Sequence, residues 1–480
     1  MVINQICGGV MMGGYLYGAS VQGIQDFIFA TNKLQEIVGA SEIVKDIANE
    51  FKDNYNPNEI YINVAGNIKA VFEDEDECKK VVLEFPKKIM QKAYGITLSQ
   101  AVVKMEGEFS ERQKAIDELE RKLKVQRNRP SIPLDLSLNI MKLNPKTAKP
   151  AIKKDEDIAT SQKLQENKEF YIKNPSVTEF KDFSYMKNHK GKIAIIHIDG
   201  NGLGNIVKKL GDKLSMFSVA LDRATKQAVK DSKEDYMHIR EVIVGGDDVT
   251  VICNANDALA FTKNFLQNFE DETKKIQELK GVKIDNKEVT KLTACAGIAY
   301  CNEKYPFHYA VDLAEALCGV AKDHSRREHS CLMFHNIQGS HFQSWSKFVK
   351  DELTITNDKC SIRCDFGPYY LKKEDRTNIG DFIHSLEAYR CEGTPISRLR
   401  EWLRELDKSS LYAQNLLERI NIITEQQDNW NCEVMNNNLK KFDKELSNKS
   451  LIIKKDRKWK TPIYDILQII SATDNPKVIK

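Results

Sequence analysis

Two short apolar runs joined by a glycine-rich acidic turn constrain the fold of this chain more than any other feature. The segment reads Glu241-Val-Ile-Val-Gly-Gly-Asp-Asp-Val-Thr-Val-Ile-Cys253. β-Branched residues dominate both runs, and the Gly-Gly pair supplies the positive φ angles that a two-residue hairpin needs. The segment therefore predicts two antiparallel strands with Asp247 and Asp248 at their turn.

The elements around this hairpin follow one recognisable order. The patterns predict strands at 193–198, 292–300 and 330–336, and helices that reach beyond Leu210 and cover 257–279 and 306–322. An order of β-α-β-β-α-β is typical of the ferredoxin-like fold. In that fold the first and third strands are adjacent and antiparallel. Asp199, which ends the first strand, is therefore expected beside Asp247 and Asp248.

Three carboxylates at one edge of a sheet favour a metal site. Like charges this close repel one another unless a cation is present, and oxygen ligands in this number suit Mg²⁺ or Mn²⁺. Each motif alone also has a plain structural interpretation, as a helix N-cap or a solvated hairpin. Their facing positions in one β-α-β-β-α-β unit favour the metal. The glycines at 200, 202 and 204 do not have the spacing of a dinucleotide fingerprint.

The first part of the chain resembles a worn copy of this unit. The segment 60–72 parallels 241–253, and the strand before Ala19 parallels the strand before Asp199, both at an offset of 180 residues (247 − 67 and 199 − 19). All three carboxylates are missing from the copy, where Ala19, Asn67 and Ile68 stand instead. Two similar domains are expected, one able to bind metal and one not, with a ligand cleft between them.

The expected fold class is α+β, with two ferredoxin-like domains, a helical connector and a helical C-terminal domain. Residues 1–108 form the degenerate domain and 191–340 the domain with the Gly-Gly-Asp-Asp motif. The charged segment 109–190 is the connector or an inserted subdomain, and helical patterns at 396–406 and 410–424 mark a C-terminal domain at 341–480.

Composition excludes several classes of protein. No run of about 18 apolar residues is present, so no membrane span is expected. The net charge of +3 gives no overall field that favours nucleic acid. The 11 cysteines are scattered without any Cys-x-x-Cys pair, which predicts reduced thiols in a cytoplasmic protein.

The motifs together resemble a known family, the large signature polymerase subunit of type III CRISPR effector systems and the compact CRISPR-polymerase-like synthases related to it. Gly245-Gly-Asp-Asp248 matches the family's best-known motif. The other matching segments are Gly18-Ala-Ser-Val-Gln-Gly-Ile-Gln-Asp-Phe-Ile28, Ile198-Asp-Gly-Asn-Gly-Leu-Gly204, Ala296-Gly-Ile-Ala299, Ala321-Lys322 and Thr461-Pro-Ile-Tyr-Asp465. In the family both ferredoxin-like domains are called palm domains.

The resemblance implies an enzyme of antiviral defence that converts ATP to cyclic oligoadenylate, a second messenger. It implies two Mg²⁺ or Mn²⁺ ions on the catalytic Asp199, Asp247 and Asp248. The implied nucleotide-binding residues are Gly200, Asn201, Gly245, Gly246 and Lys322, with Ser20 from the worn palm. The implied partners are ATP, RNA, other CRISPR effector subunits and a second copy of the chain.

Some residues depart from the family pattern and leave alternatives open. The chain has no His-Asp dipeptide for a nuclease domain, and its metal turn has Asn201 where the family usually has a second Asp. Loss of that carboxylate either weakens the second metal or only changes a local hydrogen bond. The alternative functions are a cyclase that makes a mono- or dinucleotide messenger, and a catalytically silent scaffold that binds RNA and protein.

Overall fold

The computed structural model describes residues 14–475 with short gaps. The gaps are 65, 106–108, 130–137, 139, 175–181, 340–343, 357–360, 373–375, 392, 428–436, 438, 448 and 456–457. The chain divides into two compact units, one made of 1–182, 204–223 and 276–289, the other of 183–203, 224–275 and 290–480. This division is coarser than the four domains expected from the sequence, whose boundaries stay predictions.

The first unit contains a four-stranded antiparallel sheet. Its order is β2-β3-β1-β4, as in a ferredoxin-like domain. The strands are β1 (Gly14–Gln22), β2 (Glu59–Val64), β3 (Asn67–Phe72) and β4 (Thr97–Met105). The helices are α1 (Ile24–Phe29), α2 (Leu34–Asn54), α3 (Glu75–Lys92), α4 (Phe109–Arg127) and α5 (Ile158–Lys173). The charged segment 109–190, expected as a helical connector, thus begins with helix α4.

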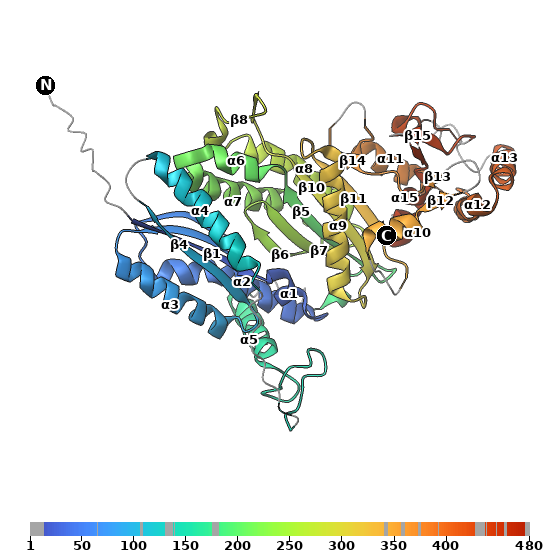
Figure 1. The fold of residues 1–480 in the computed structure, drawn as a ribbon. Helices are drawn as coiled ribbons and strands as arrows, with labels where there is room; N and C mark the ends of the chain where they lie inside the picture. Colours follow the sequence, from blue (N-terminus) through green and yellow to red (C-terminus); the bar gives the residue numbers. More distant parts are fainter. Residues whose placement is uncertain are drawn as a thin grey trace. The chain divides into compact units, whose positions relative to one another are not determined.

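Both faces of this sheet are covered (Figure 1). Successive side chains of a strand point to opposite faces. Leu16 of β1 belongs to the core cluster that includes Leu119 of α4. Its neighbour Tyr17 stacks on Phe51 of α2, with ring centroids 6.0 Å apart. Strand β1 is therefore buried on both sides.

The second unit is built on a six-stranded sheet. Its order is β14-β11-β10-β5-β7-β6, with β5 antiparallel to both β7 and β10 and β11 parallel to β10. The strands are β5 (Lys192–Gly200), β6 (Ile239–Gly245), β7 (Asp248–Asn254), β10 (Ala294–Asn302), β11 (Cys331–Asn336) and β14 (Tyr369–Tyr370). The first and third strands of the predicted order, β5 and β7, are neighbours, which confirms the topology read from the sequence.

Helices pack closely against this sheet. Helix α9 (Phe307–Ser325) crosses β10, and a Cβ at Gly297 would lie 1.9 Å from the carbonyl oxygen of Ala314, so only glycine fits there. Helix α8 (Ala258–Thr273) is buried along its face of stacked phenylalanines. Between β5 and β10 the chain also contains α6 (Leu203–Leu210), α7 (Leu214–Asp231), β8 (Lys283–Ile284) and β9 (Lys287–Glu288). Residues 204–223 and 276–289 of this stretch belong to the first unit.

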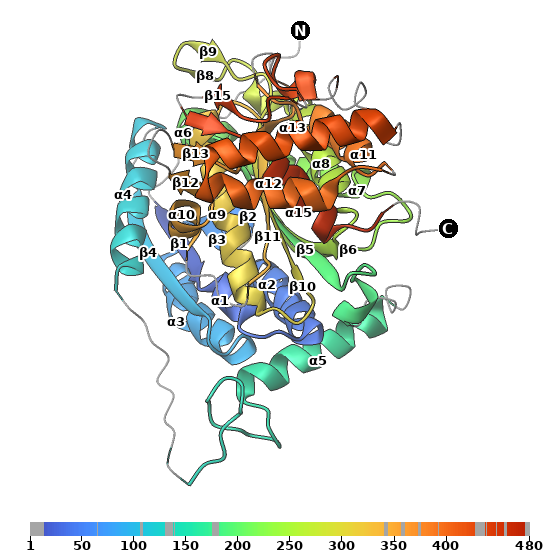
Figure 2. The same cartoon turned by 90° about the vertical axis from the view of Figure 1, so that its right-hand side faces the viewer.

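The C-terminal part of the second unit is helical, as predicted, but also contains a small sheet. Its helices are α10 (Trp345–Asp351), α11 (Ile379–Tyr389), α12 (Ile396–Lys408), α13 (Ser410–Gln427) and α15 (Ile463–Ala472), seen face-on in Figure 2. The unexpected sheet has the order β12-β13-β16-β15, formed by β12 (Thr354–Thr356), β13 (Ser361–Arg363), β15 (Ile453–Lys455) and β16 (Lys458–Lys460). Strands of three residues are too short to show a period-2 pattern.

The internal repeat predicted from the sequence is present at residue level. Ala19 of β1 lies opposite Ile68 of β3, and Asp199 of β5 lies opposite Asp248 of β7. Both pairs differ by the predicted offset of 180. The hairpins also share an irregularity, since the register shifts at 60–62 in one and 241–243 in the other. The two palms therefore align strand for strand.

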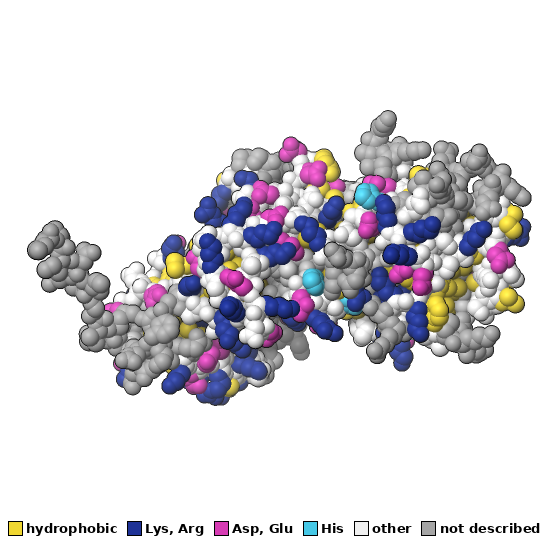
Figure 3. All heavy atoms as spheres, turned by 90° about the horizontal axis from the view of Figure 1, so that it is seen from above, with side chains coloured by type: hydrophobic (Ala, Val, Ile, Leu, Met, Phe, Trp, Pro, Cys, Tyr) yellow, Lys and Arg dark blue, Asp and Glu magenta, His cyan; other side chains and the backbone are white. Residues whose placement is uncertain are grey.

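The surface carries charges of both signs. On the face shown in Figure 3, Lys and Arg side chains are interspersed with Asp and Glu, in keeping with the net charge of +3. In the parts of the chain that the structure describes, no helix is both long and apolar enough to cross a bilayer.

Candidate active site

The strand register brings the three predicted carboxylates together. Asp199, near the end of β5, lies directly opposite Asp248, the first residue of β7. Asp247 lies in the turn before β7, and its carbonyl oxygen accepts a hydrogen bond of 3.1 Å from the Gly200 amide. The carboxylate cluster Asp199/Asp247/Asp248 thus occupies one edge of the sheet, as the strand order predicted.

Glycine at 200 allows this close approach. A Cβ on Gly200 would lie 2.8 Å from Cβ of Asp247 and 2.5 Å from Cδ1 of Leu203, closer than real contacts allow. Gly200 is therefore needed for the backbone of β5 to meet the turn. The contact with a nucleotide that the resemblance implies for Gly200 stays a prediction.

The glycines of the hairpin differ in role from the prediction. Only Gly246 has a positive φ, of 61°, whereas Gly245 is the last residue of β6 and pairs with Asp248. Glycine at the first central position of a two-residue turn accounts for this. The expectation that both glycines supply positive φ angles was wrong. The hydroxyl of Thr225, a buried residue of α7, donates to the Gly246 carbonyl and holds the turn.

Lys322 lies inside the site. Its ammonium group forms an ion pair with Asp199 and donates a hydrogen bond of 2.8 Å to the carbonyl oxygen of Gly200. The residue is only 5% exposed, although it stands in the last turn of α9. A cation of the protein itself therefore occupies one side of the carboxylate cluster.

Burial and mutual repulsion raise the pKa values of two carboxyl groups. Desolvation is the main cause at Asp248, and the charges of Asp199 and Asp247 add to it, so its pKa rises to about 8. Burial, followed by the charge and hydrogen bond of Asp199, also raises the pKa of Asp247. The charged forms are thus costly without a further cation.

Two residues near Asp248 were not predicted. Nδ1 of His197 lies 3.5 Å from Oδ1 of Asp248, but burial lowers the pKa of His197 to about 4, so the imidazole is neutral at pH 7. Glu315 of α9 adds a fourth carboxylate whose charge further raises the pKa of Asp248. Sequence spacing could have found both residues. His197 is two residues before Asp199 on the same strand face, and Glu315 is seven residues, or two helical turns, before Lys322.

Asn201 anchors the turn after β5. Its Nδ2 donates to Oγ1 of Thr293 at 3.0 Å, to the carbonyl oxygen of His329 at 3.3 Å and to Sγ of Cys295 at 3.4 Å. The residue is buried, and its Oδ1 has no hydrogen-bond partner among the described residues. Of the two consequences that the sequence left open for the missing carboxylate, this geometry favours the change in local hydrogen bonding.

Ser20 belongs to the first unit, where it contacts Asn67, one of the residues that correspond to the carboxylate cluster. Its hydroxyl donates a 3.0 Å hydrogen bond to Oδ1 of Asn67 and receives one of 3.2 Å from Gln22. Ala19 and Ile68 are both buried. Neutral and apolar residues thus fill the positions of Asp199, Asp247 and Asp248.

The donors suit a hard cation, although they do not enclose one. All three cluster side chains offer carboxylate oxygens, and Oδ1 of Asp248 is buried without a hydrogen-bond partner in the described residues. Oxygen donors of this kind match Mg²⁺ or Mn²⁺. Across the described residues, however, no three His, Cys, Asp or Glu side chains converge as a ready set of ligands. Lys322 stands on Asp199 instead.

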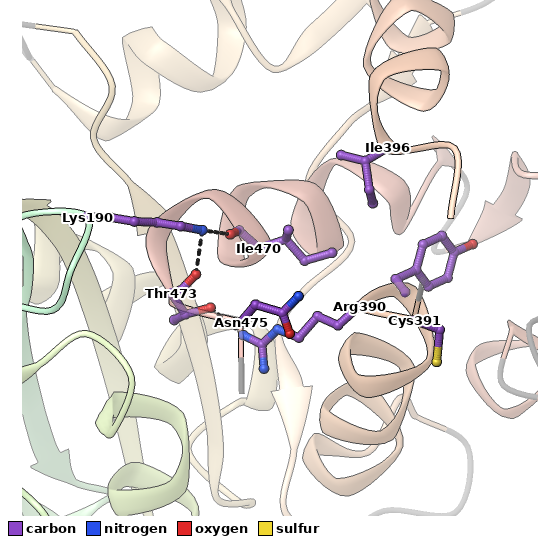
Figure 4. Close-up of a pocket in the computed structure, with 8 residues that line it drawn as sticks. Lys190, Arg390, Cys391, Ile396, Ile470, Thr473 and Asn475 are labelled. Atoms are coloured by element: carbon purple, nitrogen blue, oxygen red, sulfur yellow. Dashed lines mark hydrogen bonds between the residues drawn. The ribbon is translucent and has the colours of Figure 1, made fainter. Parts of the chain in front are cut away.

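A cavity of about 480 Å³ lies at the C-terminal end of α15 (Figure 4). Lys190 donates to the carbonyl oxygens of Ile470 and Thr473 at 2.8 and 2.6 Å, and Arg390 donates to the Thr473 hydroxyl. Cations near the C-terminal end of a helix satisfy its last carbonyls. These two cations therefore stabilise the helix end, and none of the predicted site residues lines the cavity.

Comparison with known protein families gives a match to the part of the chain that contains the candidate site. Residues 192–331 match the family model for the Cas10/Cmr2 second palm domain, a range that includes the carboxylate cluster and Lys322. No curated protein matches the sequence.

Several solved structures resemble the chain at low identity. A Csm1–Csm4 cassette in complex with cA4 gives 13% identity and a TM-score of 0.46, covering 66% of this chain and 54% of that one. The cassette with AMPPNP gives 16% and 0.44, with 66% and 54% covered. Csm1 in T. onnurineus gives 16% and 0.44, with 66% and 52% covered. The alignments thus span about half the length of these chains.

Proposed function

Because residues 192–331 match the family model for the Cas10/Cmr2 second palm domain, we propose that the chain is a metal-dependent nucleotidyltransferase that converts ATP to cyclic oligoadenylate. The observation that carries this proposal is the carboxylate cluster on facing strands, two of whose members have raised pKa values. The solved cassettes with cA4 and AMPPNP are in keeping with this substrate class.

Asp199, Asp247 and Asp248 would hold the divalent ions in this proposal. When bound, Mg²⁺ or Mn²⁺ would supply charge neutralisation at the triphosphate and would acidify the attacking 3′-hydroxyl. The buried, unpartnered Oδ1 of Asp248 supports its role as a ligand. The raised pKa values of Asp247 and Asp248 support it too, since a bound cation would offset the burial and repulsion that raise them.

Lys322 has two roles in this proposal. Without metal, its ammonium neutralises Asp199 and holds the end of β5 through the Gly200 carbonyl. With a metal ion on Asp199, the same ammonium would be free to bind the β- and γ-phosphates of ATP. Gly200, Gly245 and Gly246 act by keeping the turn compact, and Asn201 acts as its anchor.

The experiment is to incubate the purified chain with each labelled nucleoside triphosphate and Mg²⁺ or Mn²⁺, and to identify products by mass spectrometry. The matched variant is Asp247→Asn with Asp248→Asn, which preserves the shape of the turn. Cyclic oligoadenylate made by the wild type and not by the variant supports the proposal.

Other outcomes decide against it. A mono- or dinucleotide product would assign the chain to the cyclase alternative. Equal product from wild type and variant would remove the cluster from catalysis. Failure of the wild type to bind ATP with either metal, measured by calorimetry, would favour the silent scaffold.

A further inference from the structure

Two buried thiols face each other behind the candidate active site. Cys295 of β10 and Cys331 of β11 are direct partners in the parallel register, and their Sγ atoms lie 3.6 Å apart. Neighbouring strands are about 4.8 Å apart, which is within the range of about 4.4–6.8 Å between the Cα atoms of disulfide-bonded cysteines. Neither residue is exposed. The backbone is therefore already placed for a cross-strand bond.

We propose that Cys295 and Cys331 form a reversible disulfide, a redox modification site adjoining the active-site turn. The co-reactant is a small peroxide. One sulfur attacks a peroxide oxygen and becomes a sulfenic acid, releasing water when the peroxide is hydrogen peroxide. The second sulfur then displaces the hydroxyl as a second water and closes the S–S bond. Two thiols are oxidised, one peroxide is reduced, and a dithiol reductant restores the pair.

Neighbouring groups set this pair apart from the other thiols described. Cys295 Sγ receives a 3.4 Å hydrogen bond from Asn201 and lies 3.5 Å from Oγ of Ser325, so its surroundings are polar. The thiol of Cys318 donates instead to the backbone carbonyl of Cys295, at 3.1 Å. Cys391 is exposed, which makes it an internal reference for oxidant dose.

Closing the bond would disturb the active-site turn. The sulfurs must approach from 3.6 Å to about 2.0 Å. Cys331 is the first residue of β11. Cys295 of β10 pairs with Asp199 of the neighbouring strand β5. Moving Cys295 Sγ toward Cys331 withdraws an acceptor from Asn201, the anchor of the turn. The disulfide itself is independent of the proposed enzymatic function, and only its effect on activity rests on that function.

The test treats the full chain with hydrogen peroxide, then unfolds it, alkylates the remaining thiols and maps its peptides by tandem mass spectrometry. The expected result is a cross-linked pair of peptides, lighter by two hydrogen atoms, that disappears with dithiothreitol. Cys301 lies on the same tryptic peptide as Cys295. The cross-link should therefore survive Cys301→Ser and be absent in Cys331→Ser.

The size of the reagent provides a second check. Because the pair is buried, a bulky alkylating reagent should label Cys391 and leave Cys295 and Cys331 unlabelled in the folded chain, whereas peroxide should oxidise them. The proposal is overturned if Cys295 and Cys331 both remain alkylatable at a dose that has consumed the Cys391 thiol. That result in the wild type is decisive even where a variant does not fold.

The link to the active site has its own readout. Hydrogen exchange at residues 199–202 should become faster in the oxidised chain and return to its starting rate after reduction. A cross-link without any change in exchange would refute the coupling to the turn. Since neither measurement uses ATP, failure of the proposed enzymatic function would leave both results interpretable.

Discussion

Asp248→Asn isolates the energetic consequence of keeping a carboxyl group in this cluster. The carboxyl binds its proton more tightly in the folded chain, where its pKa is about 8, than in the unfolded chain, where it is near 3.8. Between these values folding takes up a proton, so the folded state loses stability as the pH rises through this window. Below it the group is protonated in both states and contributes nothing.

The size of the effect follows from that shift and from the exposure of the side chain. Moving a pKa from 3.8 to about 8 corresponds to at most about 5–6 kcal/mol. Because 38% of the Asp248 side chain remains exposed, solvent screening reduces this to about 1–2 kcal/mol. At about pH 8 and without metal, Asp248→Asn should therefore be more stable than the wild type by that amount.

The assay is thermal unfolding in EDTA at about pH 8 and again at about pH 4, with Asp235→Asn as an exposed control in the same unit. The expected rise in Tm at the higher pH is about 2–6 °C, shrinking toward zero at the lower one. An equal gain at both pH values would indicate packing in place of charge. A loss of stability at about pH 8 would refute the reasoning.

Three further predictions concern single residues. Lys322→Ala should weaken ATP binding about tenfold to a hundredfold in calorimetric titration and leave AMP binding nearly unchanged, because only ATP offers the β- and γ-phosphates; equal effects, or the same loss in Lys304→Ala, would remove Lys322 from the site. Asn201→Asp should lower the unfolding free energy in urea by about 1–3 kcal/mol, since a carboxylate would face the His329 carbonyl, and unchanged stability would contradict the anchor role. Asn67→Asp should leave the number of bound Mn²⁺ ions per chain unchanged in electron paramagnetic resonance, because Ala19 offers no carboxylate; an added ion would refute this.

Strand order and register were predictable because they depend on short-range patterns. The apolar run before Asp199 and the two runs around Gly245 and Gly246 are each buried strands, and the order of elements leaves few arrangements. That arrangement predicted Asp199 beside Asp247 and Asp248, and the observed register places it opposite Asp248. The offset of 180 residues between the palms was also readable, since it needs only the spacing of comparable motifs.

Side-chain direction was less predictable. A lysine in the last turn of a helix is usually solvated, and nothing in the sequence around Lys322 indicates that it turns inward to Asp199. In the sequence, Asn201 similarly looks like a replaced metal ligand. In the structure, its amide nitrogen donates hydrogen bonds to Thr293, Cys295 and His329. Both outcomes depend on contacts between segments about 90 to 130 residues apart, which local patterns do not encode.

The two palms together explain why the cluster points to a ligand. The worn palm keeps the same strand register with Ala19 opposite Ile68, so the fold does not require carboxylates at these positions. In the other palm, Asp199 and Asp248 occupy them, and burial and repulsion raise the pKa of Asp248. Side chains that weaken the folded state, at positions whose counterparts in the other palm are neutral, are in keeping with the ligand that the proposed function requires. A divalent cation with the triphosphate of ATP has the charge and the oxygen chemistry to do so.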